Sequence, residues 1–319
     1  MKTSDLVVVL AGGLSHEREV SLRSGRRAAQ ALRDVGHEVV ELDVSSTLLS
    51  QLEELGKPVV VPLIHGGAGE DGAIRQALEL VDVPFVGSTS RSSRVAFDKA
   101  IATPRVASAG WVTATQVALP DDMFRELGAP TLVKALAGHL GFPMMVKPAR
   151  SGSALGCTKV ERIEDLPAAM VQAYAYGGVA VVERFVTGIE VAVPVIDTGS
   201  GPVALPAVEI RPDSGVYDYT ARYTAGATRF LAPAELSDDV AERCAQLAVG
   251  AHQALGLRDL SRTDLIVDAD GVPVFLEANV APGMTETSTM PLSMEAAGMD
   301  LGHVLSDLIQ LARLRGPEA

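Results

Sequence analysis

The first ninety residues alternate short apolar runs with longer amphipathic segments. The run Leu6–Leu10 is apolar throughout, which is typical of a parallel strand buried on both faces. Gly12 and Gly13 follow it, and a pattern of helical period extends from about residue 17 to 35. Further strands are predicted at 37–44, 58–67 and 84–88, and a further helix at 70–81. This order of elements predicts a doubly wound, Rossmann-like unit.

The remaining residues alternate strands and helices in a less regular order. Helices are predicted at 91–110, 163–176, 237–255 and 294–314. Strands are predicted at 142–149, 156–162, 178–186, 188–197 and 202–210. The segment 261–280 is predicted to be a hairpin, because apolar runs flank the turn signal Ala269-Asp270-Gly271. The predicted fold class is therefore α/β.

Composition narrows the possible functions. The 319 residues suffice for two domains or three small ones, and only 4% are aromatic, which favours α/β layers over a β-sandwich. A net charge of −13 argues against a nucleic acid partner, which would need a basic surface. The two cysteines, Cys157 and Cys244, form no metal-binding or disulfide pattern. We find neither a signal peptide nor a run of the ~20 apolar residues that span a membrane, so we expect a soluble cytoplasmic protein with no membrane partner.

Three oxygen-bearing side chains lie on the predicted hairpin. Glu277 and Asn279 are two residues apart on one strand, so they share a face, and Asp264 on the other strand can join them. Carboxylate and amide oxygens suit a hard cation such as Mg²⁺, which also binds substrate phosphates. The alternative is a solvated sheet face with ordinary acids. We favour a metal site, because the segments are rich in Leu, Val and Phe, where an unpaired acid is costly.

Two loops at strand ends are candidates for binding phosphates and amines. The small residues Gly152-Ser153-Ala154 would let backbone N–H groups approach a phosphate, and Lys147, just before them, would supply a positive charge. A plain glycine-rich hairpin explains this loop equally well. Glu17 follows the first strand at the start of a helix, where it could receive a substrate ammonium or simply complement the helix dipole. His65 adds a polar group at the same edge of the sheet.

Eight segments together resemble the D-alanine–D-alanine ligases of the ATP-grasp superfamily. They follow the order and spacing of that family from about residue 10 to 290: GGLSHEREVSL, HGGAGEDG, DKAIATP, KPARSGSALG, ERFVTGIE, YDYTARY, SRTDL and EANVAPGMTETS. The resemblance implies an N-terminal Rossmann-like substrate domain at 1–90. It also implies an ATP-grasp fold of two α+β subdomains, at 91–186 and 187–319, that grip ATP between them.

The implied reaction joins two D-alanines for peptidoglycan synthesis. ATP would phosphorylate the carboxylate of the first D-alanine, and the amine of the second would attack the acyl phosphate. Glu17 would bind the first ammonium in a hydrogen-bonded set with Ser153 and Tyr223, with His65 near the first amino acid. Arg262 and the N–H of Gly283 would form the oxyanion site. Ser288 would bind the second carboxylate.

The remaining implied roles concern ATP and metal. The expected ATP contacts are Lys99, Lys147, Glu183, Val186, Glu190 and Arg222. Asp264, Glu277 and Asn279 would bind two Mg²⁺ ions, for which Mn²⁺ could substitute. The resemblance also implies a homodimer.

Three positions depart from the family pattern. Ala154 stands where a second loop serine is usual, and Val280-Ala281 where Thr-Leu is common. Arg222 replaces a usual lysine, keeping the charge but changing its geometry and reach. These departures leave room for a ligase that joins other amino acids in specialised metabolism, or for a non-catalytic ATP-binding paralogue. D-lactate is the less favoured second substrate, because the loop keeps the tyrosines of dipeptide-forming enzymes, namely Tyr217, Tyr219 and Tyr223.

Overall fold

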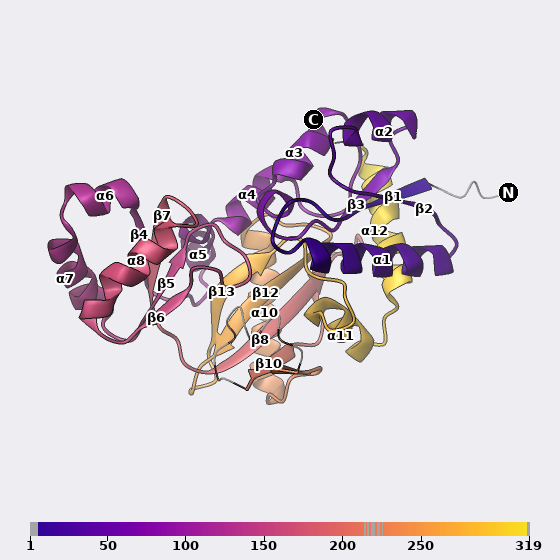
Figure 1. The fold of residues 1–319 in the computed structure, drawn as a ribbon. Coiled ribbons are helices and arrows are strands. Elements are labelled where there is room, and N and C mark those ends of the chain that lie inside the picture. The colour runs from indigo at the N-terminus through magenta and orange to yellow at the C-terminus, as the bar shows by residue number, and fades with distance from the viewer. Residues whose placement is uncertain are drawn as a thin grey trace.

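The strands form three separate sheets, each covered by its own helices (Figure 1). The computed structural model describes residues 6–317 apart from residues 214, 216, 218–220, 222, 223 and 225. The mixed α/β class expected from the sequence is confirmed.

The N-terminal sheet is parallel, with the strand order β2-β1-β3. Its strands are β1 (Leu6–Leu10), β2 (Glu38–Leu42) and β3 (Val59–Pro62). One face packs on α1 (Arg18–Asp34) and α12 (Leu301–Arg315). The other packs on α2 (Leu48–Glu54), which the sequence pattern did not predict, and on α3 (Ala73–Leu80). The strand expected at 84–88 is only a bridge between Phe85 and Val60.

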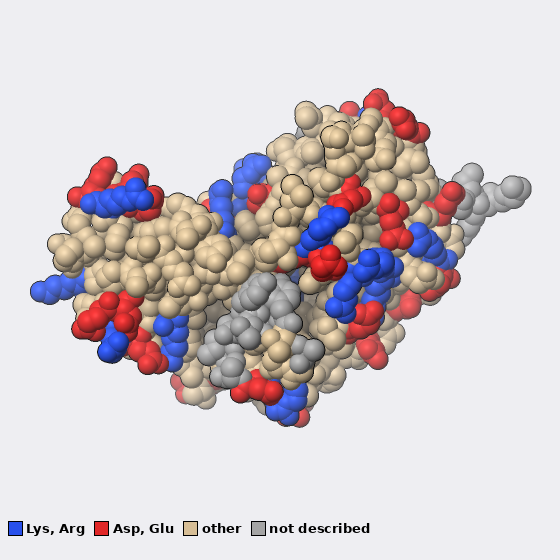
Figure 2. Space-filling model, in the orientation of Figure 1, with Lys and Arg blue, Asp and Glu red and all other residues tan. Residues whose placement is uncertain are grey.

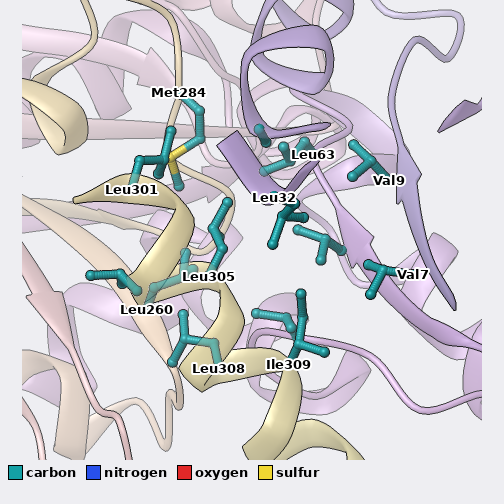
Figure 3. Packing of buried hydrophobic residues seen from close by; sticks show 14 of the residues in the cluster. Val7, Val9, Leu32, Leu63, Leu260, Met284, Leu301, Leu305, Leu308 and Ile309 are labelled. Atoms are coloured by element: carbon teal, nitrogen blue, oxygen red, sulfur yellow. The ribbon is translucent and has the colours of Figure 1, made fainter. Parts of the chain in front are cut away.

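The core beneath α1 joins distant parts of the chain. Figure 3 shows Leu32 of α1 close to Val9 of β1 and to Leu305 of α12. Met284 and Leu260, which lie near the functional loops described below, belong to the same cluster. The C-terminal helix therefore shares the core of the N-terminal sheet, while the domain boundaries at residues 90 and 186 stay predictions.

The second sheet is antiparallel and lies in the middle of the sequence. Its order is β4 (Gln116–Pro120), β7 (Val179–Arg184), β5 (Met144–Pro148) and β6 (Thr158–Val160). The helices α7 (Ala129–Leu140) and α8 (Leu166–Tyr174) bury its apolar side chains. A short helix, α6 (Asp121–Glu126), follows β4 directly. The sequence pattern predicted neither β4 nor the two helices between it and β5.

The third sheet is antiparallel and has β8 (Ile189–Ile196) and β12 (Leu260–Val267) at its centre. The hairpin partner of β12 is β13 (Pro273–Asn279). On the far side of β8 lie β9 (Val203–Ala204), β10 (Val208–Pro212) and β11 (Thr228–Leu231). The helix α10 (Asp238–Ala254) covers one face.

Two helices that the pattern predicted as continuous are each broken in two. The helix expected at 91–110 consists of α4 (Ser90–Phe97) and α5 (Lys99–Ser108), because Asp98 is extended and its side chain accepts the N–H of Ala100. The helix expected at 294–314 consists of α11 (Thr289–Ala296) and α12, because Gly298 takes a φ of 68° and Asp300 caps the second helix. Capping side chains at these positions compete with helix continuation.

A β-bulge in the β12–β13 hairpin sets which side chains face the functional site. Asp264 pairs with Glu277, whereas the next residue of β12, Leu265, pairs with Phe275. The residue between, Leu276, is the extra one. Strict alternation would put Phe275 and Glu277 on one face, but the bulge lets Phe275 enter the hydrophobic core while Glu277 stays on the opposite face.

The surface carries both signs of charge. Figure 2 shows acidic and basic side chains interspersed on the face in view. Within the described residues, no helix is long and apolar enough to cross a membrane.

Candidate functional site

A cavity of about 500 Å³ opens where the N-terminal sheet, the glycine-rich loop and the third sheet meet. It brings together nine residues that the sequence singled out: Glu17, His65, Lys99, Ser153, Arg262, Glu277, Asn279, Gly283 and Ser288. Tyr223 and Arg222 lie outside the described residues. The cavity thus gathers groups contributed by segments more than 250 residues apart in the sequence.

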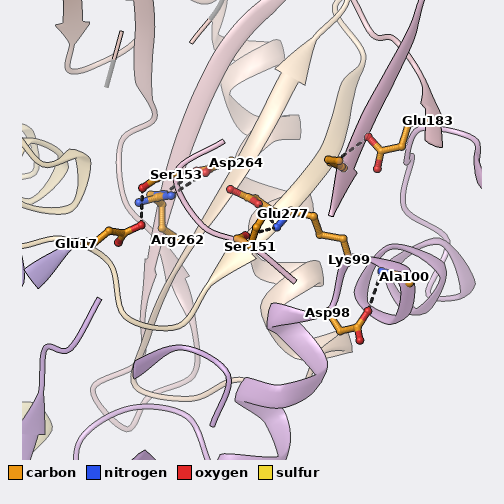
Figure 4. A network of polar contacts seen from close by, with 11 residues as sticks. Glu17, Asp98, Lys99, Ala100, Ser151, Ser153, Glu183, Arg262, Asp264 and Glu277 are labelled. Carbon is orange, nitrogen blue, oxygen red and sulfur yellow. Dashed lines mark hydrogen bonds and ion pairs between the residues drawn. The ribbon is translucent and has the colours of Figure 1, made fainter. Parts of the chain in front are cut away.

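Glu17 lies at the N-terminal end of α1 and is 7% exposed. The Ser153 hydroxyl donates to its Oε1 at 2.5 Å, which closes the glycine-rich loop onto the N-terminal sheet (Figure 4). Small residues are required around this carboxylate. A Cβ on Gly152 would lie 3.0 Å from Glu17 Oε1, and one on Gly66 would lie 3.3 Å from its Cδ.

Glu70 is a buried carboxylate in the same cavity that the sequence analysis did not single out. It accepts a hydrogen bond from the Gly66 N–H at 3.0 Å. Burial, together with the nearby charge of Glu17, raises the pKa of Glu70 to about 7. The available signal was its position in an Asp-and-Gly-containing turn just after the His65 strand end, which is the ligand-binding edge of such sheets.

His65 is buried and connects α1 to the loop after β13. Its Nε2 lies 2.9 Å from the hydroxyl of Ser24, which also accepts the Met284 N–H at 3.0 Å. Burial lowers the pKa of His65 to about 4, so the ring is neutral near pH 7. A neutral imidazole here holds the loop that carries Gly283 and contributes no charge to the cavity.

Arg262 presents the fixed positive charge of the cavity. Its Nε and Nη2 donate to the two carboxylate oxygens of Asp264 at 2.7 and 2.8 Å (Figure 4). Burial lowers the pKa of Arg262, but the Asp264 carboxylate outweighs it, and the net pKa lies above the ordinary value. Asp264 itself is buried, does not line the cavity and holds the Arg262 guanidinium in place.

Lys99 and Glu277 form a second ion pair at the cavity wall. Lys99 Nζ lies 2.9 Å from Glu277 Oε2 and donates to the Ser151 carbonyl at 2.8 Å. Burial lowers the pKa of Lys99, but Glu277 raises it by more. Asn279 Oδ1 accepts the Ala281 N–H at 2.7 Å, which fixes the start of the loop toward Gly283.

The expected metal ligands fit a hard cation by their chemistry. Asp264 and Glu277 are direct cross-strand neighbours, and Asn279 follows on the face of Glu277. All three present oxygen donors, and each of the two carboxylates forms an ion pair, Glu277 with Lys99 and Asp264 with Arg262. Within the described residues, no group of three or more His, Cys, Asp or Glu is arranged as a ready metal site. Metal binding would therefore require these carboxylates to share their oxygens with Lys99 and Arg262.

Four expected ATP contacts lie away from the described cavity lining. Lys147 on β5 and Glu183 on β7 are buried and form an ion pair at 2.8 Å. Val186 follows β7 and Glu190 lies on β8, both half-buried. The polar pair of Lys147 and Glu183 sits on the sheet that carries the glycine-rich loop, so these residues stay candidates for a nucleotide site beside the cavity.

Comparison with known proteins identifies the family of this chain. The family described as D-ala D-ala ligase C-terminus matches residues 108–310. A D-alanine–D-alanine ligase of Desulforudis audaxviator is 41% identical over 311 residues, covering 96% of this chain and 98% of the relative. One of Bordetella avium is 38% identical over 313 residues, covering 98% and 96%.

Solved structures agree with this likeness. The VanG D-Ala:D-Ser ligase of Enterococcus faecalis superposes with a TM-score of 0.84 at 27% identity, covering 97% of this chain and all of that one. A D-alanine–D-alanine ligase of Bacillus anthracis complexed with ATP gives 0.80 at 26% identity, covering 97% and 98%. The fold is that of the ATP-grasp ligases. The chain belongs to the D-alanine–D-alanine ligase family.

Proposed function

We propose that this protein is an ATP-dependent ligase that joins two D-alanines into D-alanyl-D-alanine for cell wall synthesis. The observation that carries the proposal is the cavity in which Glu17 and Arg262 offer opposite charges to one small zwitterion. Full-length similarity to D-alanine–D-alanine ligases supports the substrate.

The first D-alanine binds between these two charges. Its ammonium contacts Glu17, whose second role is to hold Ser153 and the glycine-rich loop closed. Its carboxylate faces Arg262 and the backbone N–H of Gly283. Since Asp264 holds the guanidinium by two hydrogen bonds, this charge is preorganised and need not rearrange during the reaction.

The reaction then proceeds in two balanced steps. A carboxylate oxygen of the first D-alanine attacks the γ-phosphorus of ATP, releasing ADP and giving an acyl phosphate. The ammonium of the second D-alanine releases one proton to solvent, and the resulting amine attacks the acyl carbon. Inorganic phosphate then leaves with the bridging oxygen, and the nitrogen releases a second proton to solvent as the peptide bond forms. Arg262 and Gly283 stabilise the oxyanion that develops at this carbon.

Lys99 serves as an ATP-phosphate contact, and Mg²⁺ would be held by Glu277, Asn279 and Asp264. When bound, the cation would neutralise negative charge on the phosphates of ATP. Lys99 and Arg262 form ion pairs with two of these ligands, Glu277 and Asp264. On the family resemblance, we extend the proposal to two ions, to Lys147, Glu183, Val186, Glu190 and Arg222 around the nucleotide, and to a homodimer in the cytoplasm.

A phosphate-release assay tests the proposal. Purified protein is incubated with ATP, Mg²⁺ and either D-alanine alone or a panel of L- and D-amino acids that includes D-serine and D-lactate as acceptors. We expect ATP-dependent phosphate with D-alanine alone and a dipeptide mass in the product. ATP binding without phosphate under all conditions would instead favour a non-catalytic paralogue, and turnover only with other amino acids would favour a specialised ligase.

A further inference from the structure

One charged side chain of the cavity has no part in the roles described above. Arg23 lies on α1, six residues after Glu17, and lines the cavity together with Val20. These residues follow one another along the side of α1 that faces the site. The N-terminal end of this side carries the group proposed for the first ammonium, and Arg23 lies about 9 Å further along the helix axis.

The position of Arg23 is defined by the loop that it contacts. Its Nη2 lies 3.4 Å from Glu286 Oε2. One turn further along α1, Arg27 donates to the carbonyl oxygens of Met284 and Thr285 at 3.2 and 2.8 Å. The two arginines thus contact the loop from residue 284 to 286, and Ser288, two residues further on, is the N-cap of α11.

Ser288 lines the cavity and is held in place by Thr285. Its hydroxyl accepts the Thr285 N–H at 3.1 Å and lies 2.8 Å from the Thr285 hydroxyl. The first turn of α11 adds the positive end of the helix dipole. A carboxylate bound at Ser288 would therefore lie on the loop that Arg23 contacts.

The ion pair between Arg23 and Glu286 is weak enough to be exchanged. Its separation is long, and the two side chains are 55% and 68% exposed. Exposed pairs of this kind contribute little free energy, so an incoming carboxylate can replace Glu286 as the partner of the guanidinium.

We propose that Arg23 is a specificity-determining residue that selects an acceptor substrate with a free carboxylate, and that Glu286 opposes it. The proposal rests on the ligase function proposed above, since it concerns the second substrate of that reaction. Arg23 provides the attraction toward the acceptor carboxylate. Glu286 lowers that attraction by pairing with Arg23 and by repelling the same carboxylate.

A competition between two acceptors tests the proposal. D-alaninamide has the amine of D-alanine but no carboxylate to phosphorylate, so it can act only as the acceptor. The protein is supplied with ATP, Mg²⁺, D-alanine and D-alaninamide, and mass spectrometry measures the ratio of D-alanyl-D-alanine to D-alanyl-D-alaninamide. This ratio does not depend on the amount of active protein, so a variant that merely folds less well leaves it unchanged.

We expect Arg23→Ala to lower the product ratio roughly three- to tenfold, as for loss of a partly exposed charge contact. Arg23→Lys should retain part of the preference, and Glu286→Gln should raise the ratio. Arg26→Ala is the matched control, because Arg26 lies on the same helix, is exposed and does not line the cavity. Its ratio should equal that of the unmodified protein.

The proposal is overturned if Arg23→Ala and Arg26→Ala give the same ratio, or if Arg23→Ala and Glu286→Gln shift it in one direction. If the unmodified protein forms no amide product, the KM of the acceptor D-alanine decides, with the KM of ATP as the reference. A rise in the KM of the acceptor D-alanine without a rise in the KM of ATP in Arg23→Ala supports the proposal, and an unchanged KM of the acceptor refutes it. A protein that makes no D-alanyl-D-alanine under any condition refutes the proposed function instead.

Discussion

At the scale of single residues, the cavity combines charges that are fixed with charges that depend on pH. Arg262 is permanently cationic and held by Asp264. His65 and Glu70 are buried nearby with pKa values moved in opposite directions, to about 4 and about 7. Burial disfavours the charged form of both groups, which lowers the value for a base and raises it for an acid. Near neutral pH the His65 ring is therefore uncharged, while the charge of Glu70 changes with pH.

Arg262→Ala should lower kcat by roughly 10²–10³-fold, the range found when one oxyanion-stabilising donor is removed. Arg262→Lys should lower kcat by a smaller factor, because lysine keeps the positive charge but cannot make both hydrogen bonds with Asp264. Steady-state phosphate release measures both variants, and circular dichroism checks that each is folded. A folded Arg262→Ala protein with kcat within about threefold of the original would contradict the assigned role.

Glu70→Gln should change the pH dependence of stability. The pKa of Glu70 rises from about 4.5 in the unfolded chain to about 7 in the native state, so between these values the native state binds more protons. The free energy of unfolding contributed by Glu70 therefore falls as pH increases through this window and stays low above it. Thermal melts at pH 5 and pH 8 measure the effect. The variant should gain stability relative to the original at pH 8 but not at pH 5, and an equal difference at both values would refute the assignment.

The sequence predicted site residues where the residue type and its neighbours indicate a chemical role. Glu17, Ser153 and Glu277 were predicted from their chemistry at strand ends and on a strand face, whereas Arg262 was predicted only from the family resemblance. Glu70 was not singled out, because an acid before a helix is usually an ordinary dipole partner and its burial is a tertiary property.

At the scale of elements, breaks in regular structure position the site. The break between α4 and α5 places Lys99 at the first position of α5, beside the cavity. Asp98 causes this break by capping α5. Its carboxylate also forms an ion pair with Arg150, whose Nε lies 2.8 Å from Asp98 Oδ2. The period of apolar residues runs through this break, so the sequence predicted one helix. Similarly, alternation alone could not predict the bulge at Leu276, because a bulge is selected by packing on both faces.

Asp98→Ala should destabilise the protein by about 1 kcal/mol through loss of a cap and should also raise the KM of ATP, because Lys99 loses its fixed position. Thr89→Ala is the matched control. Thr89 caps α4 by accepting the Ser92 N–H, so its loss should cost a similar free energy without changing the KM of ATP. Urea unfolding and ATP-saturation kinetics measure the two quantities. Equal KM values for the two variants would show that the break does not position Lys99.

At the scale of the whole molecule, ion pairs and shared cores join segments that the sequence keeps apart. Asp259, just before β12, is 2% exposed and accepts the Gly87 N–H at 2.7 Å. Arg315, at the end of α12, donates to both of its carboxylate oxygens at 2.6 and 2.7 Å. This contact ties the C-terminal helix and the N-terminal sheet to the strand that carries Arg262. No local pattern predicts such a contact, because its partners are 56 and 172 residues apart.

Arg315→Ala should lower the free energy of unfolding by about 3 kcal/mol, because it removes the ion-pair partner of a buried carboxylate. Asp259 has a φ of 63°, which glycine adopts without strain. The double variant Arg315→Ala/Asp259→Gly should therefore recover part of the loss. Urea unfolding of both proteins measures this recovery. A double variant less stable than Arg315→Ala alone would contradict this explanation.

The central claim of this account is that the cavity activates a carboxylate by phosphoryl transfer from ATP. Positional labelling tests it directly. D-alanine labelled with ¹⁸O in both carboxylate oxygens is incubated with the protein, ATP and Mg²⁺, and the released phosphate is analysed by mass spectrometry. Passage through an acyl phosphate predicts one ¹⁸O atom in each phosphate and one in the peptide carbonyl of the dipeptide. Dipeptide formation with unlabelled phosphate would contradict the account.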